Sequence, residues 1–118
     1  MIRVLLVDDN ESFEKYIMPY LKAKGFEVVL EKTGIKSIET FKNNNPDIVV
    51  LDLGLPDMDG AEVYLQMKDF NSDIPVGILS GYGEREKELL SMGVKAFFEK
   101  PVMAPEIEEW INEVLKKE

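Results

Sequence analysis

Short runs of hydrophobic residues alternate along the chain with longer segments in which hydrophobic residues recur every three or four positions. The short runs are rich in β-branched residues and contain few polar positions, which is typical of parallel strands covered on both faces. The pattern therefore predicts buried strands at residues 2–7, 28–30, 48–51, 76–79 and 96–98.

The segments between these runs predict amphipathic helices, because their hydrophobic residues would share one helix face. Pro19 interrupts the first helix, where its ring would crowd the carbonyl of Lys15, so we expect a kink or a break there. Asp59 is expected to cap the third helix, and the turn at 58–60 is assigned no chemistry. The expected helices lie at about residues 13–24, 35–43, 60–67, 84–92 (closed by Gly93) and 107–115.

Strands and helices that alternate over short connections predict an open, parallel, doubly wound α/β sheet, in which ligands bind outside the carboxyl ends of the strands. Polar residues follow four of the expected strands at that edge. Three carboxylates in one hollow cannot all stay ionised without a cation, so the pattern predicts a divalent-metal site with a reactive aspartate. The residues concerned are Asp8, Asp9, Asp52, Ser80 and Lys100.

Each of these residues also has an ordinary structural explanation. Asp8 or Asp9 could cap the first helix, and Asp52 could simply open a turn. Ser80 could belong to an unremarkable turn, and Lys100 could be a solvated surface charge. These explanations are favoured for each residue singly, but the whole set at matching strand ends favours one shared site.

The composition narrows the chemistry. The chain has 118 residues, of which 45% are hydrophobic, so we expect a single domain over residues 1–118 with no output domain. It contains no cysteine and no histidine, so any bound metal should be a hard ion with oxygen ligands. The net charge of −9 argues against direct binding of nucleic acid. No segment resembles a signal peptide or a membrane span, so we expect a cytoplasmic protein without a membrane partner.

The motifs, taken in order, resemble the receiver domain of two-component response regulators. The resemblance covers essentially the whole chain and rests on residues 7–10, 47–60, 79–81 and 96–101. Each segment is weakly specific alone, but their order and spacing together are strongly specific. The resemblance implies a flavodoxin-like (βα)5 fold with a central five-stranded parallel sheet in the strand order 2-1-3-4-5.

The resemblance also implies a role for each polar residue. Asp52 would accept a phosphoryl group, Lys100 would offset its charge, and Ser80 would donate a hydroxyl hydrogen bond to it. Mg²⁺ would be the cofactor, because it prefers a few carboxylates together with water and phosphate oxygens. Its protein ligands would be Asp9 directly, Asp8 mostly through water, Asp52, and the backbone carbonyl of Gly54.

The family's switch would follow from the same site. On phosphorylation Ser80 would move toward the phosphoryl group, and Phe97, at the aromatic switch position, would turn inward. This would shift the surface formed by the fourth helix, the fifth strand and the fifth helix. Tyrosine is commoner at that position, so with Phe97 the readout must rest on packing. Gly54 and Tyr82 flank the site at positions that tune phosphoryl lifetime in the family.

The implied function is a phosphorylation-activated signalling switch and not a conventional enzyme, although the domain would catalyse phosphorylation and dephosphorylation of Asp52. A chain without histidine needs a phosphohistidine partner, either a sensor histidine kinase or a histidine phosphotransfer protein. That partner would dock near the first helix, around residues 13–17. The switched surface would control a downstream effector or output domain, in a monomer or a phosphorylation-dependent dimer.

Three other functions fit the sequence less well. A Mg²⁺-dependent phosphatase on a related sheet usually has a second aspartate two residues after the nucleophile, where this chain has Gly54. A nucleotide-binding protein would need a glycine-rich phosphate loop after the first strand. A binding module that is never phosphorylated stays open as an alternative, although the full acidic set and Lys100 speak against it.

Overall fold

The computed structural model describes residues 1–81 and 85–115, and within them five parallel strands form one sheet in the order β2-β1-β3-β4-β5. This order confirms the predicted doubly wound, flavodoxin-like architecture. The expectations for Tyr82 and for a helix start at residue 84 lie outside the described residues. The strands are β1 (Arg3–Val7), β2 (Glu27–Glu31), β3 (Ile48–Asp52), β4 (Val76–Ser80) and β5 (Ala96–Glu99).

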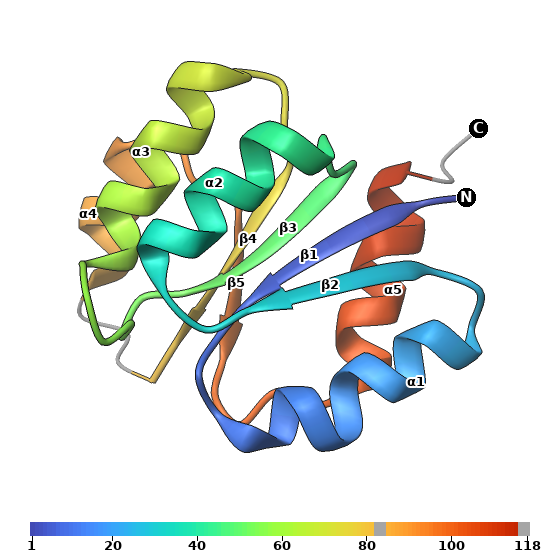
Figure 1. Cartoon of the computed structure of the whole chain (residues 1–118). Coiled ribbons are helices and arrows are strands. Elements are labelled where there is room, and N and C mark those ends of the chain that lie inside the picture. The colour runs from blue at the N-terminus through green and yellow to red at the C-terminus, as the bar shows by residue number, and fades with distance from the viewer. Residues whose placement is uncertain (82–84, 116–118) are drawn as a thin grey trace.

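Helices cover both faces of the sheet (Figure 1). The elements α2, α3 and α4 pack on one face, and α1 and α5 pack on the other. None of these helices, within the part of the chain that the structure describes, combines the length and the apolar character needed to cross a bilayer. The helices are α1 (Met18–Ala23), α2 (Gly34–Asn44), α3 (Gly60–Phe70), α4 (Glu86–Ser91) and α5 (Ala104–Leu115), and a π-helical segment η1 (Phe13–Ile17) precedes α1.

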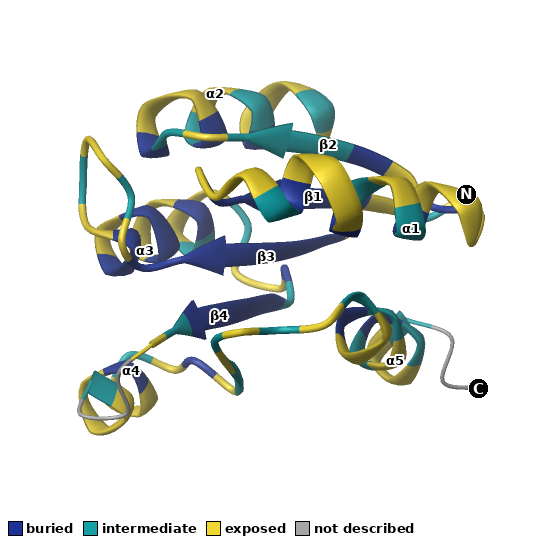
Figure 2. Ribbon diagram, turned by 90° about the horizontal axis from the view of Figure 1, so that it is seen from below, coloured by how far each residue is buried: buried dark blue, intermediate teal, exposed yellow. Residues whose placement is uncertain are grey.

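The central strands are buried on both faces, as their continuous hydrophobic runs predict. Leu5 of β1 packs under α2 and α3, whereas the next residue, Leu6, packs under α1 and α5. This alternation follows from the two-residue period of side chains along a strand. Figure 2 shows β3 buried along its whole length, and every residue from Ile48 to Asp52 is buried. Burial of each large aliphatic side chain contributes roughly 2 kcal/mol.

The predicted disruption at Pro19 takes the form of a wider helical turn and not of a break. The amide of Met18 donates to the carbonyl of Phe13, five residues earlier, which is the hydrogen bond of a π-helix. This change of register lies directly before the proline, whose ring does not fit regular α-helical hydrogen bonding. Phe13 and Ile17 both stay buried against the sheet, so the helix keeps its packed face.

Candidate functional site

The carboxyl ends of β1, β3 and β5 bring two carboxylates and an ammonium group into contact. Asp8 directly follows β1, Asp52 is the last residue of β3, and Lys100 directly follows β5. Lys100 Nζ lies 3.2 Å from Asp8 Oδ2 and 2.9 Å from Asp52 Oδ1. Asp8 is 0% exposed and Asp52 is 5% exposed. One ammonium group therefore bridges two buried carboxylates at the predicted edge of the sheet.

Asp9 completes a group of three carboxylates at this edge. One carboxylate oxygen from each of Asp8, Asp9 and Asp52 can be chosen so that all three lie within 4.8 Å of one another. Asp9 is exposed, so the group is open to solvent on that side. Within the described residues Asp8 Oδ2 is buried without a hydrogen bond of good geometry, although Lys100 is near it. Such a set of oxygen donors suits a hard divalent cation.

The electrostatics of the pocket also favour an additional cation. The pKa of Asp8 is raised above its ordinary value, mainly because the group is buried and also because Asp52 repels its negative charge. The hydrogen bond from the Asn10 amide and the attraction of Lys100 lower this pKa, but they do not cancel the increase. Burial by itself would lower the pKa of Lys100, but the hydrogen bond to Asp52 and the attraction of Asp8 outweigh it and raise that pKa. The single ammonium stays charged, yet it cannot neutralise three carboxylates.

The start of the first helix does not use the paired aspartates as caps. The side chain of Asn10 accepts the amide of Ser12 at 2.8 Å, and the carbonyl of Asn10 accepts the amide of Phe13 at 3.1 Å. Asp8 instead accepts the amide of Asn10 at 2.8 Å, which holds the chain as it leaves β1. Asn10 therefore takes the capping role that the sequence allowed for Asp8 or Asp9.

Ser80 and Phe97, the two residues of the predicted switch, lie on the neighbouring strands β4 and β5. Ser80 ends β4 beside the site, and its carbonyl accepts the amide of Lys100 at 3.1 Å. Phe97 is half-buried and packs against the core on the face of α3 and α4. Its neighbour Phe98 points to the other face, where its ring meets Trp110 edge-on at 5.5 Å. Phe97 therefore packs against the same core cluster as Leu89 of α4.

The loop that follows β3 lies against the end of that strand with little free space. Gly54 and Asp59 pair across the loop in an antiparallel bridge, and the amide of Gly60 donates to the carbonyl of Leu53 at 3.0 Å. A Cβ atom at Gly60 would lie 2.3 Å from the backbone oxygen of Asp52. Asp59 caps α3 by accepting the amide of Ala61, as predicted. The tight packing of Gly60 was not predicted. The feature of the sequence that could have indicated it is a glycine directly after a capping aspartate.

A second carboxylate of this loop, Asp57, holds the N-terminus of α2. Its Oδ1 accepts the amide of Gly34 at 2.7 Å, and its Oδ2 accepts the amide of Ile35 at 2.9 Å. These two hydrogen bonds lower the pKa of Asp57 below its ordinary value of 3.8, and the hydrogen bond from Gly34 has the larger effect. The amides of a helix N-terminus favour negative charge, so Asp57 ties the loop to α2 while it is ionised.

The Asp57→Asn variant should be less stable than the wild type at neutral pH, and the difference should shrink in acid. Because the folded-state pKa of Asp57 lies below 3.8, its carboxylate stabilises the fold above that value and loses this effect as the pH falls through the lower folded value. Urea denaturation at about pH 7 and about pH 3 measures the difference, with the exposed Asp69 changed to Asn as a surface control. A difference independent of pH would contradict the assignment.

Comparisons with known proteins agree with this geometry. The chain matches the family model of the response regulator receiver domain over residues 4–112. The chemotaxis protein CheY of Bacillus subtilis is 32% identical over 116 residues, which are 96% of this chain and 97% of the relative. The response regulator MprA of a Mycobacterium species is 28% identical, and the match covers 98% of this chain and 51% of the relative.

Solved structures give the same result. The crystal structure of a CheY-like receiver domain protein from Methanospirillum hungatei has a TM-score of 0.90 at 26% identity, and the match covers 99% of this chain and 95% of that one. The response regulator TrrA of Thermotoga maritima, in complex with Mg²⁺-BeF, has a TM-score of 0.86 at 25% identity, over 98% of this chain and 100% of that one. The chain therefore belongs to the family of response regulator receiver domains of two-component systems.

Proposed function

We propose that this receiver domain is a phosphorylation-driven switch in which Asp52 accepts the phosphoryl group. The observation that carries the proposal is the position of Lys100, whose ammonium contacts both Asp8 and Asp52 in a pocket of three carboxylates. A carboxylate oxygen of Asp52 would attack the phosphorus of a donor. The bond between phosphorus and the leaving group would break, and its electron pair would stay with the leaving group. The product is an acyl phosphate on Asp52.

Lys100 and Ser80 would assist this transfer. Phosphoryl transfer depends mainly on positioning and on neutralising charge, because the phosphoryl oxygens carry negative charge throughout. Lys100 already lies 2.9 Å from Asp52, so its ammonium is placed to contact the incoming phosphoryl oxygens. Ser80 would donate its hydroxyl from the end of the neighbouring strand. With the same groups the domain would catalyse both phosphorylation and dephosphorylation of Asp52.

Mg²⁺ is the cofactor that we propose for the acidic pocket. The donor set consists of oxygens alone. Within the described residues the buried Asp8 Oδ2 accepts no hydrogen bond of good geometry, so it could coordinate a cation. When bound, the ion supplies positive charge that offsets the charge of the transferring group. The relative TrrA was solved with Mg²⁺-BeF, which supports this choice. The residues that would hold the ion are Asp8, Asp9, Asp52 and, by its carbonyl, Gly54.

The output would pass through Ser80 and Phe97 to the surface formed by α4, β5 and α5. Ser80 would move toward the phosphoryl group, and the half-buried ring of Phe97 would turn inward into the space beside α4. A phenylalanine has no hydroxyl, so the change would be read through packing. The switched surface would control a downstream effector or an output domain, and it could also form a phosphorylation-dependent dimer.

The partner that supplies the phosphoryl group would be a sensor histidine kinase or a histidine phosphotransfer protein in the cytoplasm. The sequence places its docking surface around residues 13–17, but Phe13 and Ile17 are only 2% and 4% exposed. They belong to the core, so changing them would test stability and not docking. The exposed residues of this segment are Glu14, Lys15 and Tyr16, and we assign the docking surface to them.

With Mg²⁺ and acetyl phosphate as a small phosphodonor, the wild-type chain should gain one phosphoryl group by intact mass. Chelation of the metal by EDTA should prevent the gain, because the carboxylates would then repel the donor. The alternative of a binding module that is never phosphorylated predicts no gain under either condition. A wild-type chain that binds Mg²⁺ but gains nothing would favour that alternative and refute the proposed function.

A further inference from the structure

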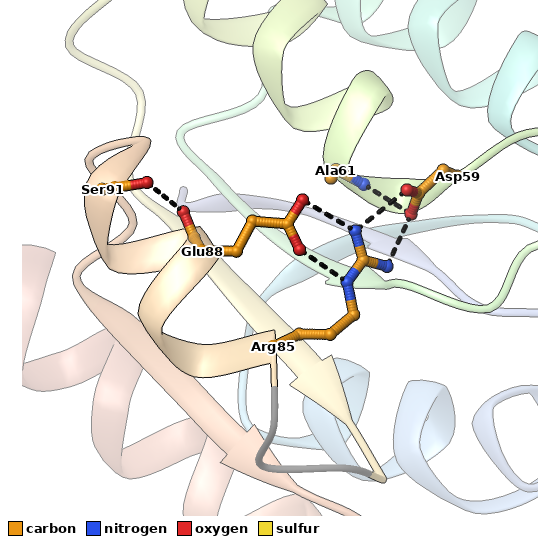
Figure 3. A network of polar contacts seen from close by, with 5 residues as sticks. All are labelled: Asp59, Ala61, Arg85, Glu88 and Ser91. Atoms are coloured by element: carbon orange, nitrogen blue, oxygen red, sulfur yellow. Dashed lines mark hydrogen bonds and ion pairs between the residues drawn. The ribbon is translucent and has the colours of Figure 1, made fainter.

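A cluster of ion pairs joins the start of α4 to the loop that follows β3 (Figure 3). Arg85, the residue before α4, donates from Nη1 and Nη2 to the two carboxylate oxygens of Asp59, both at 3.0 Å. Its Nε also donates to Oε1 of Glu88 at 3.0 Å. Two parallel hydrogen bonds between a guanidinium and a carboxylate fix the relative orientation of the two groups better than a single ion pair does.

The partner of Arg85 lies next to the proposed metal site. Asp59 pairs through its backbone with Gly54, whose carbonyl is a proposed ligand of Mg²⁺. On the far side of Asp59, Gly60 is packed against the backbone oxygen of Asp52. A displacement of Asp59 would therefore move the backbone of Gly54 directly, because the two residues form one bridge of the loop.

The helix that carries this link has one buried residue within the part of the chain that the structure describes. α4 is six residues long, and Leu89 is its buried residue. Arg85 occupies the N-cap position of α4, and its guanidinium contacts Asp59, the N-cap residue of α3. The side chains of Arg85 and Asp59 are 32% and 49% exposed. Ion pairs this exposed usually add little to global stability, so the consequence of this one should be local.

We propose that Arg85 is a positioning residue for the metal site, acting through Asp59 on the loop that presents the carbonyl of Gly54. The inference rests on the proposed function, because it assumes that Gly54 and the aspartates bind Mg²⁺. Arg85 holds Asp59 from the side of α4, and Asp57 holds the same loop from the side of α2. Because coupling between two equilibria is reciprocal, bound Mg²⁺ also stabilises the contact between Arg85 and Asp59.

The Arg85→Gln variant should bind Mg²⁺ about three- to tenfold more weakly than the wild type, measured by isothermal titration calorimetry. The Asp59→Asn variant should show a similar loss of Mg²⁺ affinity. Asparagine can still cap α3, but it cannot form the two-hydrogen-bond ion pair with Arg85. The double variant should be no weaker than either single one, since both changes remove the same interaction. Losses that add in the double variant would overturn the proposal.

Glu88→Gln is the matched control, because it removes the other carboxylate partner of Arg85 and leaves the link to Asp59. It should bind Mg²⁺ within about twofold of the wild type. The Mg²⁺ affinity of Arg85→Lys should lie between those of Arg85→Gln and the wild type, because lysine keeps the positive charge but cannot donate two parallel hydrogen bonds. Thermal unfolding without metal separates the alternatives: a purely structural role would lower the melting temperature and leave the Mg²⁺ affinity unchanged. That result would overturn this inference alone, whereas a wild type that does not bind Mg²⁺ would overturn the proposed function with it.

Discussion

The Asp52→Asn variant should gain no phosphoryl group under conditions that phosphorylate the wild type. The substitution keeps the size of the side chain and a hydrogen-bond acceptor toward Lys100, but it removes the anionic oxygen that attacks phosphorus. Asp8 cannot replace it readily, because Asp8 is 0% exposed and its pKa is raised by burial. We expect the rate to fall at least about a hundredfold, equivalent to about 2.7 kcal/mol in the barrier.

Intact-mass spectrometry over a time course with acetyl phosphate and Mg²⁺ measures this loss. Asp47→Asn is the matched control, because Asp47 is exposed and directly precedes the opposite end of β3. There its carboxylate accepts the amide of Arg3 at 2.8 Å, a role that asparagine can also fill. The control should be phosphorylated at the wild-type rate. Equal phosphorylation of Asp52→Asn and the wild type would mean that another residue is the acceptor.

The Gly60→Ala variant should be destabilised by about 3 kcal/mol or more. The added Cβ would lie 2.3 Å from the backbone oxygen of Asp52 and 2.6 Å from Cα of Leu53. Neither backbone atom can move aside without displacing β3, so the clash exceeds ordinary overpacking of a core. Alanine normally favours a helix over glycine by about 1 kcal/mol, so the expected sign is opposite to the helix propensity.

Urea denaturation of Gly60→Ala beside Gly81→Ala tests the steric argument. Among the described residues, a Cβ at Gly81 would meet no atom within 4 Å, and Gly81 does not have a positive φ. The control should therefore change the free energy of unfolding by less than about 1 kcal/mol. Similar stabilities for the two variants would show that the loop after β3 yields easily. The metal site beside Gly60 would then be less rigid than its packing indicates.

Local pattern was sufficient for the order and type of the elements. The runs at residues 48–51 and 76–79 became β3 and β4 because strands covered on both faces have few polar positions. Gly93 ends its helix as predicted, and Gly25 ends the first helix in the same way, with φ values of 93° and 98° that are typical of a helix C-terminus. The π-helical turn before Pro19 could not be predicted, because it depends on how Phe13 and Ile17 pack against the sheet.

Most of the candidate site was also predicted, for a topological reason. Residues that follow parallel strands must meet at one edge of the sheet, so Asp8, Asp52 and Lys100 could be placed together before any distance was known. The attachments of the loop after β3 were not predicted. Asp57 and Gly34 are 23 residues apart, and Arg85 and Asp59 are 26 residues apart. Charged residues at such separations have many potential partners, and the packing of the helices selects among them.

The sequence by itself therefore determined the alternation of strands and helices, the sheet type and the set of residues at its carboxyl edge, because these follow from local periodicity and chain order. The tertiary structure alone decided that Lys100 bridges Asp8 and Asp52, that Gly60 has no room for a side chain, and that Arg85 reaches Asp59. These contacts join segments far apart in the chain, and they form only when strand register and helix packing bring the side chains within a few ångströms of one another.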